Sequence, residues 1–282
     1  MTDLPFQPDE IGLWSELKLE IVEKYGQAYT NAFNKRGAHL QKYYSDGFSG
    51  GGIHLSKRTG EQIEGSPARA LKITPPFNGF YFIDMNADKT AYLEQVRAGR
   101  SNVEIHTGDT NPYLKRLLPA IKYSDYKRAL CLLDPYGLHL EWDVIQIAGQ
   151  LKTVDLFLNF PIMDINRNVL RRDPTKAASE DIDRMNRFWG DKSWDAAAYV
   201  DTGQTNMFDA GPDRLKQSNT AIVAAFRDRL RRVAGFKYVP APVAMTNRNN
   251  AVLYYLFFAS ANDTGKKIIQ SIFNKYRRPR PR

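Results

Sequence analysis

Glycines gather directly after a predicted strand in this chain, next to an acidic residue. Residues 43–52 read YYSDGFSGGG, so the strand-forming stretch ends at Asp46 and the glycines follow at once. Glycine lets the backbone approach a bound small molecule closely and adopts positive φ angles at little steric cost. A single loop of this kind has several uses, so the residues that follow the later strands decide its meaning.

Three further predicted strands each end in, or are followed by, an aspartate: Asp84, Asp109 and Asp134. The carboxyl ends of parallel strands meet at one edge of a sheet, and ligands bind outside that edge. S-adenosylmethionine has no phosphate; its ammonium group, ribose hydroxyls and adenine amino group all donate to carboxylates. The layout therefore predicts an S-adenosylmethionine site on a doubly wound sheet.

We expect seven residues to bind this cofactor: Asp46, Gly47, Phe48, Gly50, Gly52, Asp84 and Asp109. Asp46 and the backbone N–H groups of the glycine loop would hold the methionine part. Asp84 would accept hydrogen bonds from the ribose hydroxyls, and Asp109 one from the adenine amino group. Each aspartate taken alone could equally cap a helix or be solvated in a loop.

The sequence Asp134-Pro135-Tyr136-Gly137 is the candidate for the reaction itself. A target amine that donates to Asp134 keeps its nitrogen lone pair directed at a methyl donor, while Pro135 fixes the turn and Tyr136 stacks on the target. Asp-Pro also begins many ordinary turns, so the motif has a purely structural interpretation too. We expect Asp134, Pro135 and Tyr136 to be the catalytic residues.

Strands and helices alternate along the first half of the chain. The strands are expected at 39–46, 80–83, 103–106, 129–133 and 154–160, with helices at 14–33, 89–98, 114–121 and 142–151. This alternation predicts a parallel sheet covered by helices on both faces. Two later strand-like runs, 237–245 and 252–259, flank an Asn-rich turn and predict a β-hairpin, a combination typical of class I methyltransferases.

The expected fold is α/β: a Rossmann-like class I methyltransferase sheet, mostly parallel with a C-terminal antiparallel hairpin, plus a helical insertion. Its parts are an N-terminal arm and helix (1–38), the Rossmann-like domain (39–166 and 219–264), the insertion (167–218), and a basic C-terminal helix and tail (265–282). No clear strand is expected in the insertion, and 50–65 is expected to be a long polar loop.

Forty Lys and Arg against 31 Asp and Glu leave a formal charge of +9 in the 282 residues, which favours a polyanionic partner such as RNA or DNA. Lys18, Arg277 and Arg278 are the candidate phosphate contacts, although Lys18 could be an ordinary solvated helix residue. One cysteine excludes an internal disulfide framework or an iron–sulfur cluster, and the four histidines lack metal-ligand spacing. From the histidine spacing we expect no metal site. No signal peptide or membrane-spanning run is recognisable, so we expect a cytoplasmic protein.

Several blocks of the chain resemble the three-Cys-motif partner proteins (TcmP family) over most of its length. The blocks are Trp14–Lys18, Asp46–Gly50, Gly65–Pro67, Phe82–Asp84, Gly108–Asp109, Leu133–Gly137, Glu141–Trp142, Asn166–Arg167 and Leu256–Ser260. The resemblance implies a partner that carries a three-cysteine motif and looks like a radical-SAM protein. The blocks are also similar to methyltransferases that modify base amines of ribosomal RNA and DNA, whose motif has a second proline that is missing here.

We therefore predict a bacterial S-adenosylmethionine-dependent methyltransferase that modifies an amino nitrogen of a nucleic-acid base. One alternative is a non-catalytic subunit that docks the three-cysteine protein through exposed aromatic residues of the insertion: Phe188, Trp189 and Trp194. A second alternative is a metal-dependent nuclease with Asp46, Asp84 and Asp134 around the metal.

Overall fold

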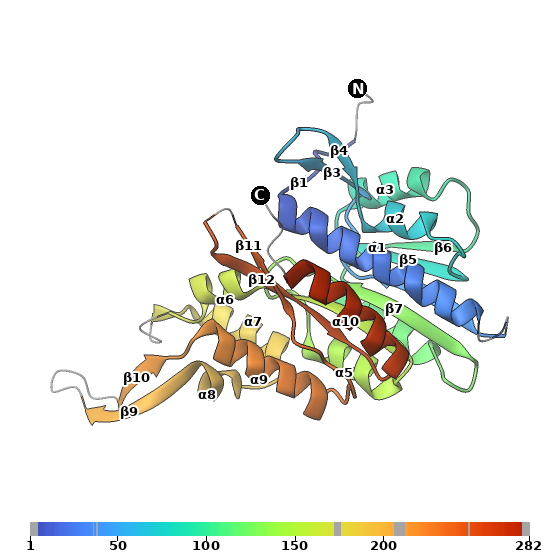
Figure 1. Ribbon diagram of the computed structural model, residues 1–282. Helices are drawn as coiled ribbons and strands as arrows, with labels where there is room; N and C mark the ends of the chain where they lie inside the picture. The colour runs from blue at the N-terminus through green and yellow to red at the C-terminus, as the bar shows by residue number, and fades with distance from the viewer. Residues whose placement is uncertain are drawn as a thin grey trace.

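The computed structural model describes residues 5–35, 37, 39–171, 176–205, 212–247 and 249–277. A seven-stranded sheet forms its centre, in the order β11-β12-β8-β7-β2-β5-β6 (Figure 1). The strands are β2 (Gln41–Asp46), β5 (Gly79–Asp84), β6 (Val103–Thr107), β7 (Lys127–Leu133), β8 (Val154–Phe160), β11 (Val243–Thr246) and β12 (Val252–Ala259).

The strand directions confirm the predicted fold class. Strands β2, β5, β6, β7 and β8 run parallel to one another, whereas β12 runs antiparallel to both β8 and β11. Strand β8 is buried at all seven positions, including the polar residues Asp155 and Asn159, as expected of a strand covered on both faces. The hairpin β11–β12 completes the sheet as predicted, with a first strand shorter than expected.

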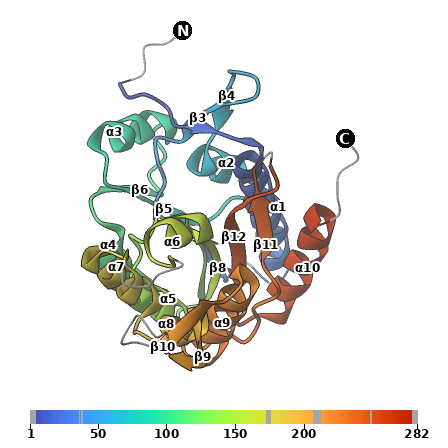
Figure 2. The same ribbon diagram turned by 90° about the vertical axis from the view of Figure 1, so that its left-hand side faces the viewer.

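Helices cover both faces of the sheet (Figure 2). The first face carries α1 (Leu13–Asn34), α2 (Ser66–Lys72), α3 (Ala87–Val96) and α10 (Asp263–Arg277), whose buried side chains share one hydrophobic core. The second carries α4 (Thr110–Leu117), the 3-10 turn η1 (Leu118–Ala120), α5 (Trp142–Leu151) and α9 (Asn219–Arg232), which share the other core. None of the described helices is both long and apolar enough to cross a membrane.

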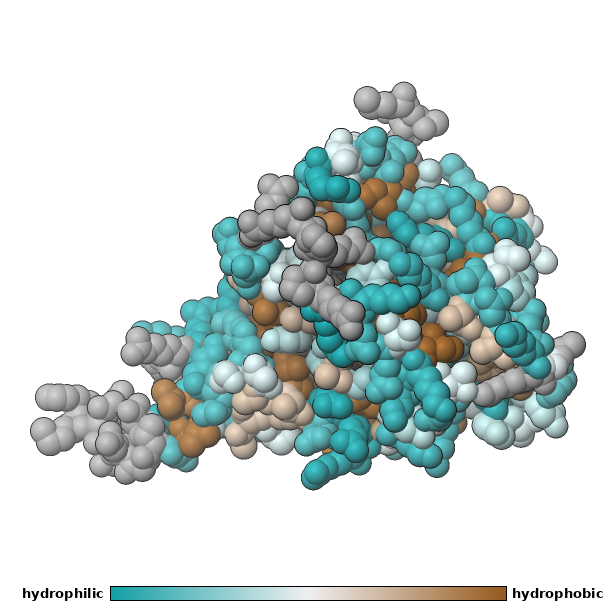
Figure 3. Space-filling model, in the orientation of Figure 1, coloured by the Kyte–Doolittle hydropathy of each residue, from teal (hydrophilic) through white to brown (hydrophobic). Residues whose placement is uncertain are grey.

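The segment expected to be a helical insertion contains helices and also a two-stranded ribbon. Helices α6 (Ile162–Asn168), α7 (Ser179–Trp189) and α8 (Trp194–Ala198) precede β9 (Tyr199–Thr205) and β10 (Pro212–Lys216). The expectation of no strand was wrong because the ribbon has no apolar run. Its paired residues Val200 and Leu215 are 50% and 62% exposed, and hydrophobic residues are visible beside the ribbon in Figure 3.

The three aromatic residues proposed as an exposed interface are buried. Phe188, Trp189 and Trp194 are 0%, 2% and 6% exposed and belong to the core beneath α5 and α9. Phe188 stacks on Phe226 of α9, with ring centroids 5.6 Å apart. The correction follows from packing: a short amphipathic helix such as α7 buries its aromatic side wherever a larger apolar surface is available.

A small sheet replaces the long polar loop expected at 50–65. Strands β3 (Ile53–Ser56) and β4 (Gln62–Glu64) form a hairpin around the turn at 57–60, and β1 (Glu10–Ile11) pairs parallel with β3. The N-terminal segment is thereby held over the carboxyl end of the main sheet, directly before α1. This small sheet forms part of the wall of the candidate site.

Candidate functional site

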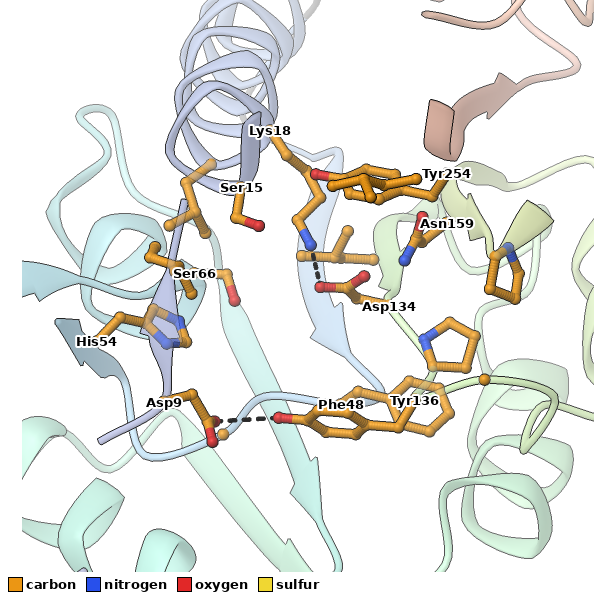
Figure 4. A pocket seen from close by; sticks show the side chains of 18 of the residues that line it. Asp9, Ser15, Lys18, Phe48, His54, Ser66, Asp134, Tyr136, Asn159 and Tyr254 are labelled. Carbon is orange, nitrogen blue, oxygen red and sulfur yellow. Dashed lines mark hydrogen bonds and ion pairs between the residues drawn. The ribbon is translucent and has the colours of Figure 1, made fainter. Parts of the chain in front are cut away.

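A cavity of about 630 Å³ lies at the carboxyl ends of β2 and β7 (Figure 4). The strand order reverses at this point, since β5 and β6 lie on one side of β2 whereas β7 and β8 lie on the other. Asp46 at the end of β2 is opposite Leu132 of β7, so Asp134 follows two residues beyond the pair. Open α/β sheets bind their ligands in the crevice at such a reversal.

Asp84 holds the glycine loop in place. Its carboxylate accepts hydrogen bonds from the backbone N–H of Gly50 at 2.8 Å and from that of Asn86 at 2.9 Å. Gly50 has a φ of +61°, lines the cavity, and has no protein atom within 4 Å of the position that a Cβ would take. The loop therefore leaves room for a ligand beside Gly50.

Of the other residues of the glycine loop, one lines the cavity and two pack against neighbouring side chains. Phe48 lines the cavity, as Gly50 does. A Cβ on Gly47 would lie 2.8 Å from side-chain atoms of Leu133 and Thr110, so this glycine is required for close packing of the strand ends. Gly52, with a φ of +75°, packs under Leu93 of α3, and it lies outside the set of described residues that line the cavity.

Asp46 is completely buried beneath the cavity. Burial raises the pKa of Asp46 to about 7; the Ser66 hydroxyl and the Phe48 backbone N–H oppose this shift, and the negative charge of Asp134 adds to it. Its carboxyl group is therefore partly protonated near neutral pH. A buried acid of this kind can either donate or accept a hydrogen bond at the cavity floor.

Lys18 of α1 points into the cavity and donates to the carboxylate of Asp134 (Figure 4). The two side chains are only 8% and 28% exposed, and the ammonium group lies 5.3 Å from the centroid of the Tyr254 ring. Burial opposes the charge of Lys18, but the Asp134 carboxylate outweighs it and raises the pKa of the lysine. The interpretation of Lys18 as a solvated helix residue was therefore wrong.

The sequence contained a signal for this arrangement. Lys18 follows Trp14 by four residues and precedes Ile21 and Tyr25 by three and seven, so it belongs to the apolar side of the helix. A charged residue on a buried side requires a partner of opposite charge. Only the tertiary structure identifies that partner as the first residue of the Asp134-Pro135-Tyr136 motif.

Two residues that the sequence interpretation missed line the cavity, and each has a buried polar atom without a partner. Asn159, at the end of β8, is 8% exposed, and its Oδ1 atom is buried without a hydrogen-bond partner. The Nδ1 atom of His54 on β3 is buried without a partner as well, and burial, with the charge of Lys18, lowers the pKa of this histidine. Buried polar atoms without partners are costly unless a ligand or water satisfies them.

Tyr136 lies at the mouth of the cavity and is 60% exposed. Its hydroxyl donates to Asp9 of the N-terminal segment at 3.0 Å (Figure 4). Lys89 of α3 donates to the same carboxylate at 2.6 Å. Pro135 lines the cavity beside it. The N-terminal segment thus closes one side of the cavity by linking the Asp134 motif to the helix that follows Asp84.

Three of the predicted site residues lie apart from this group. Asp109 accepts a hydrogen bond from the backbone N–H of Asn111 at 2.9 Å and caps α4, so its contact with adenine stays a prediction. Arg277 lies on α10 and donates to the carbonyl oxygen of Ala241. Arg278 lies outside the described residues. In the part of the chain that the structure describes, no three His, Cys, Asp or Glu side chains gather to hold a metal, and Asp46, Asp84 and Asp134 are among the described residues.

No family model matches this chain, and no curated protein matches it. Among solved structures it is similar to protein LPL1258 of Legionella pneumophila, of the DUF519 family, with 12% identity and a TM-score of 0.52 over 92% of both chains. The N-terminal domain of EvdMO1, crystallised in the presence of SAH and D-fucose, is 10% identical with a TM-score of 0.38 over 84% of this chain and 83% of that domain.

The bifunctional kinase-methyltransferase WbdD is 8% identical, with a TM-score of 0.41 over 86% of this chain and 39% of WbdD. At these TM-scores WbdD and EvdMO1 carry no argument, and the similarity to LPL1258 concerns the fold alone. The fold is the predicted α/β one, with a mostly parallel sheet completed by an antiparallel hairpin, and LPL1258 shares it. The resemblance to the TcmP family stays a prediction.

Proposed function

We propose that this protein is an S-adenosylmethionine-dependent methyltransferase that modifies an amino nitrogen of a nucleic-acid base. One observation carries the proposal: the glycine loop tied to Asp84 and the Asp134-Pro135-Tyr136 motif face the same cavity, at the reversal of the strand order. A cofactor on the loop side would therefore present its reactive group to an acceptor held at Asp134.

The residues present fit the proposed cofactor. The open space beside Gly50 admits a ligand close to the backbone, and Phe48 offers an apolar surface next to it. A carboxylate has about four lone-pair sites, and Asp84 uses two of them for Gly50 and Asn86. Asp84 itself is buried and lies outside the set of described residues that line the cavity, so its contact with ribose hydroxyls stays a prediction.

When bound, S-adenosylmethionine would supply a methyl group that passes from its positively charged sulfur to the acceptor nitrogen, with S-adenosylhomocysteine and one proton as the other products. Asp134 would accept a hydrogen bond from an N–H group of the amine and so direct the nitrogen lone pair into the cavity. Lys18 would hold the carboxylate of Asp134 in one position through their ion pair. Tyr136, exposed at the mouth, would stack on the base, and the polar atoms of Asn159 and His54 would bind its edge.

The direct test is calorimetry with S-adenosylmethionine on the wild type and on Asp84→Ala. We expect binding by the wild type and an affinity at least tenfold lower in Asp84→Ala. The control Asp125→Ala, which changes an exposed aspartate outside the cavity lining, is expected to bind with unchanged affinity. Methyl transfer is then measured with labelled cofactor on RNA and DNA from a strain that lacks the gene, with Asp134→Ala, which has no side-chain acceptor, as the inactive variant. Absence of cofactor binding by the wild type would refute the proposal.

The alternative of a non-catalytic docking subunit gives a different result in the same experiments. Such a subunit would form a stable complex with a three-cysteine protein in size-exclusion chromatography and transfer no methyl group to any nucleic acid. Its docking surface would have to lie elsewhere than on the buried aromatic residues of α7 and α8. Nothing in the described site favours this alternative over the enzyme.

A further inference from the structure

A strongly basic groove lies between α9, α10 and the segment that leads to β11. It has a volume of about 320 Å³, and four cationic side chains line it: Arg227, Arg231, Lys237 and Lys266. Its other described lining residues are Tyr238, Val239, Pro240 and Gln270, so none of them is acidic. Hydrophilic residues predominate over α10 in the view of Figure 3.

The groove lies at the edge of the sheet opposite the cavity. Tyr238 pairs with Ser260, the residue after the end of β12, and β12 runs antiparallel to β8. The segment at 237–240 is therefore near the amino ends of the parallel strands, whereas the cavity is at their carboxyl ends. A seven-residue strand such as β7 separates the two edges by about 23 Å.

Two of the cations make cation–π contacts with the aromatic ring of Tyr238. The ammonium groups of Lys237 and Lys266 lie 5.2 and 5.0 Å from the centre of this ring. Arg227 donates through Nε to the carbonyl oxygen of Val239 at 2.7 Å, which orients its two terminal nitrogens. The contacts of a ring and a carbonyl hold the cations in place without neutralising their charge.

The acidic residues near the groove do not balance its charge. Arg231 and Asp228 are 4.0 Å apart with both side chains more than half exposed, and Asp263 is paired with Lys267 at 2.8 Å. Arg277 lies close to the groove, since it donates to the carbonyl oxygen of Ala241, the residue that follows the lining residue Pro240. Like charges held together in this way favour an anionic ligand that relieves their repulsion.

We infer that this groove binds the phosphate backbone of a nucleic-acid strand. Guanidinium and ammonium groups around an aromatic residue are the combination that single-stranded nucleic acids bind. A nucleic acid is favoured over an acidic protein segment because one continuous strand can contact both the groove and the cavity, about 23 Å apart. Binding at the groove does not require methyl transfer; if the proposed function holds, it makes the substrate a polynucleotide rather than a free nucleoside.

The test is fluorescence anisotropy with a labelled 30-nucleotide single-stranded RNA, titrated at several KCl concentrations. Four phosphate contacts predict a slope of log K against log [KCl] of about −3. In Lys237→Glu/Lys266→Glu we expect a shallower slope, with a magnitude of about 1.5 or below, and an affinity at low salt that is about tenfold lower. The control Lys35→Glu/Lys122→Glu carries the same change in net charge on exposed lysines outside the groove and is expected to retain the slope.

Circular dichroism melts and calorimetry with S-adenosylmethionine on each variant separate a folding defect from a loss of contacts. Equal salt slopes for the groove variant and the control would overturn the inference. So would a polyglutamate peptide that displaces the RNA at equal charge concentration, because that result identifies an acidic protein as the ligand. Wild-type RNA binding without cofactor binding would refute the methyltransferase proposal and leave the groove assignment intact.

Discussion

Removing either partner of the ion pair between Lys18 and Asp134 is expected to lower the free energy of unfolding, and the loss is expected to be larger when Asp134 is removed. Replacing Asp134 by Asn leaves the ammonium of Lys18 buried without its counter-charge, at 8% side-chain exposure. Replacing Lys18 by Met leaves a carboxylate that is 28% exposed and that water can reach. Loss of one partner of a buried pair costs about 3–5 kcal/mol, so we expect about this loss for Asp134→Asn and about 1–3 kcal/mol for Lys18→Met.

The way in which stability changes with pH is a second, independent test of this ion pair. In the wild type the pKa of Lys18 is raised above 10.5, so its stabilising contribution is present below that pH and is lost as the pH rises through the folded-state pKa. In Asp134→Asn the largest remaining influence is burial, which lowers the pKa of the lysine. The unfolded chain then binds more protons, and the stability of this variant is expected to rise with pH below 10.5.

The assay is urea denaturation followed by tryptophan fluorescence at pH 6, 7.5 and 9. It uses the wild type, both single variants and the double variant Lys18→Met/Asp134→Asn. Since the double variant leaves neither charge buried, we expect it to be more stable than Asp134→Asn. Single variants that lose less than about 0.5 kcal/mol and add independently in a double-mutant cycle would show that the pair is not a buried one.

Three further variants test other parts of the structure. Asp46→Asn removes a carboxyl group whose pKa is raised to about 7, so the free energy of unfolding of the wild type falls as the pH rises from about 4 through 7, and that of the variant falls less. By urea denaturation, the loss between pH 4 and pH 8 is expected to be of order 4 kcal/mol larger in the wild type. Equal pH dependence in the two proteins would contradict the burial of Asp46. Gly50→Ala places a methyl group in the cavity at a φ of +61°, and we expect weaker S-adenosylmethionine binding in calorimetry with about 1 kcal/mol of lost stability; unchanged affinity would place the ligand elsewhere. Phe188→Ala opens a space in the core and is expected to cost about 3–5 kcal/mol in chemical denaturation, whereas a cost below about 1 kcal/mol would indicate a surface residue.

Local patterns in the sequence determined the framework of this protein. The helix at 142–151 and the strand at 154–160 were predicted with the bounds that the structure has, because a buried strand is apolar at nearly every position and an amphipathic helix repeats its apolar residues with period 3.6. The parallel sheet and the final hairpin followed from the order of such elements. That order also places Asp46, Asp84 and Asp134 at neighbouring strand ends.

Weak or mixed local patterns gave wrong predictions. The ribbon β9–β10 and the hairpin β3–β4 are short and half-exposed, so they lack the apolar run by which a strand is recognised. The aromatic residues of α7 and α8 were assigned to the surface because the segment around them is charged. Whether such side chains are buried depends on the elements packed against them, and these lie far along the chain.

Only the tertiary structure decided which polar groups share one space. Lys18 and Asp134 are 116 residues apart, Asn159 comes from β8 and His54 from the small N-terminal sheet, yet all four line one cavity. The basic groove likewise joins residues of α9 and α10 on either side of the hairpin. A sequence pattern reports the environment of neighbouring residues, whereas the partner of a buried charge is set by how the helices cross the sheet.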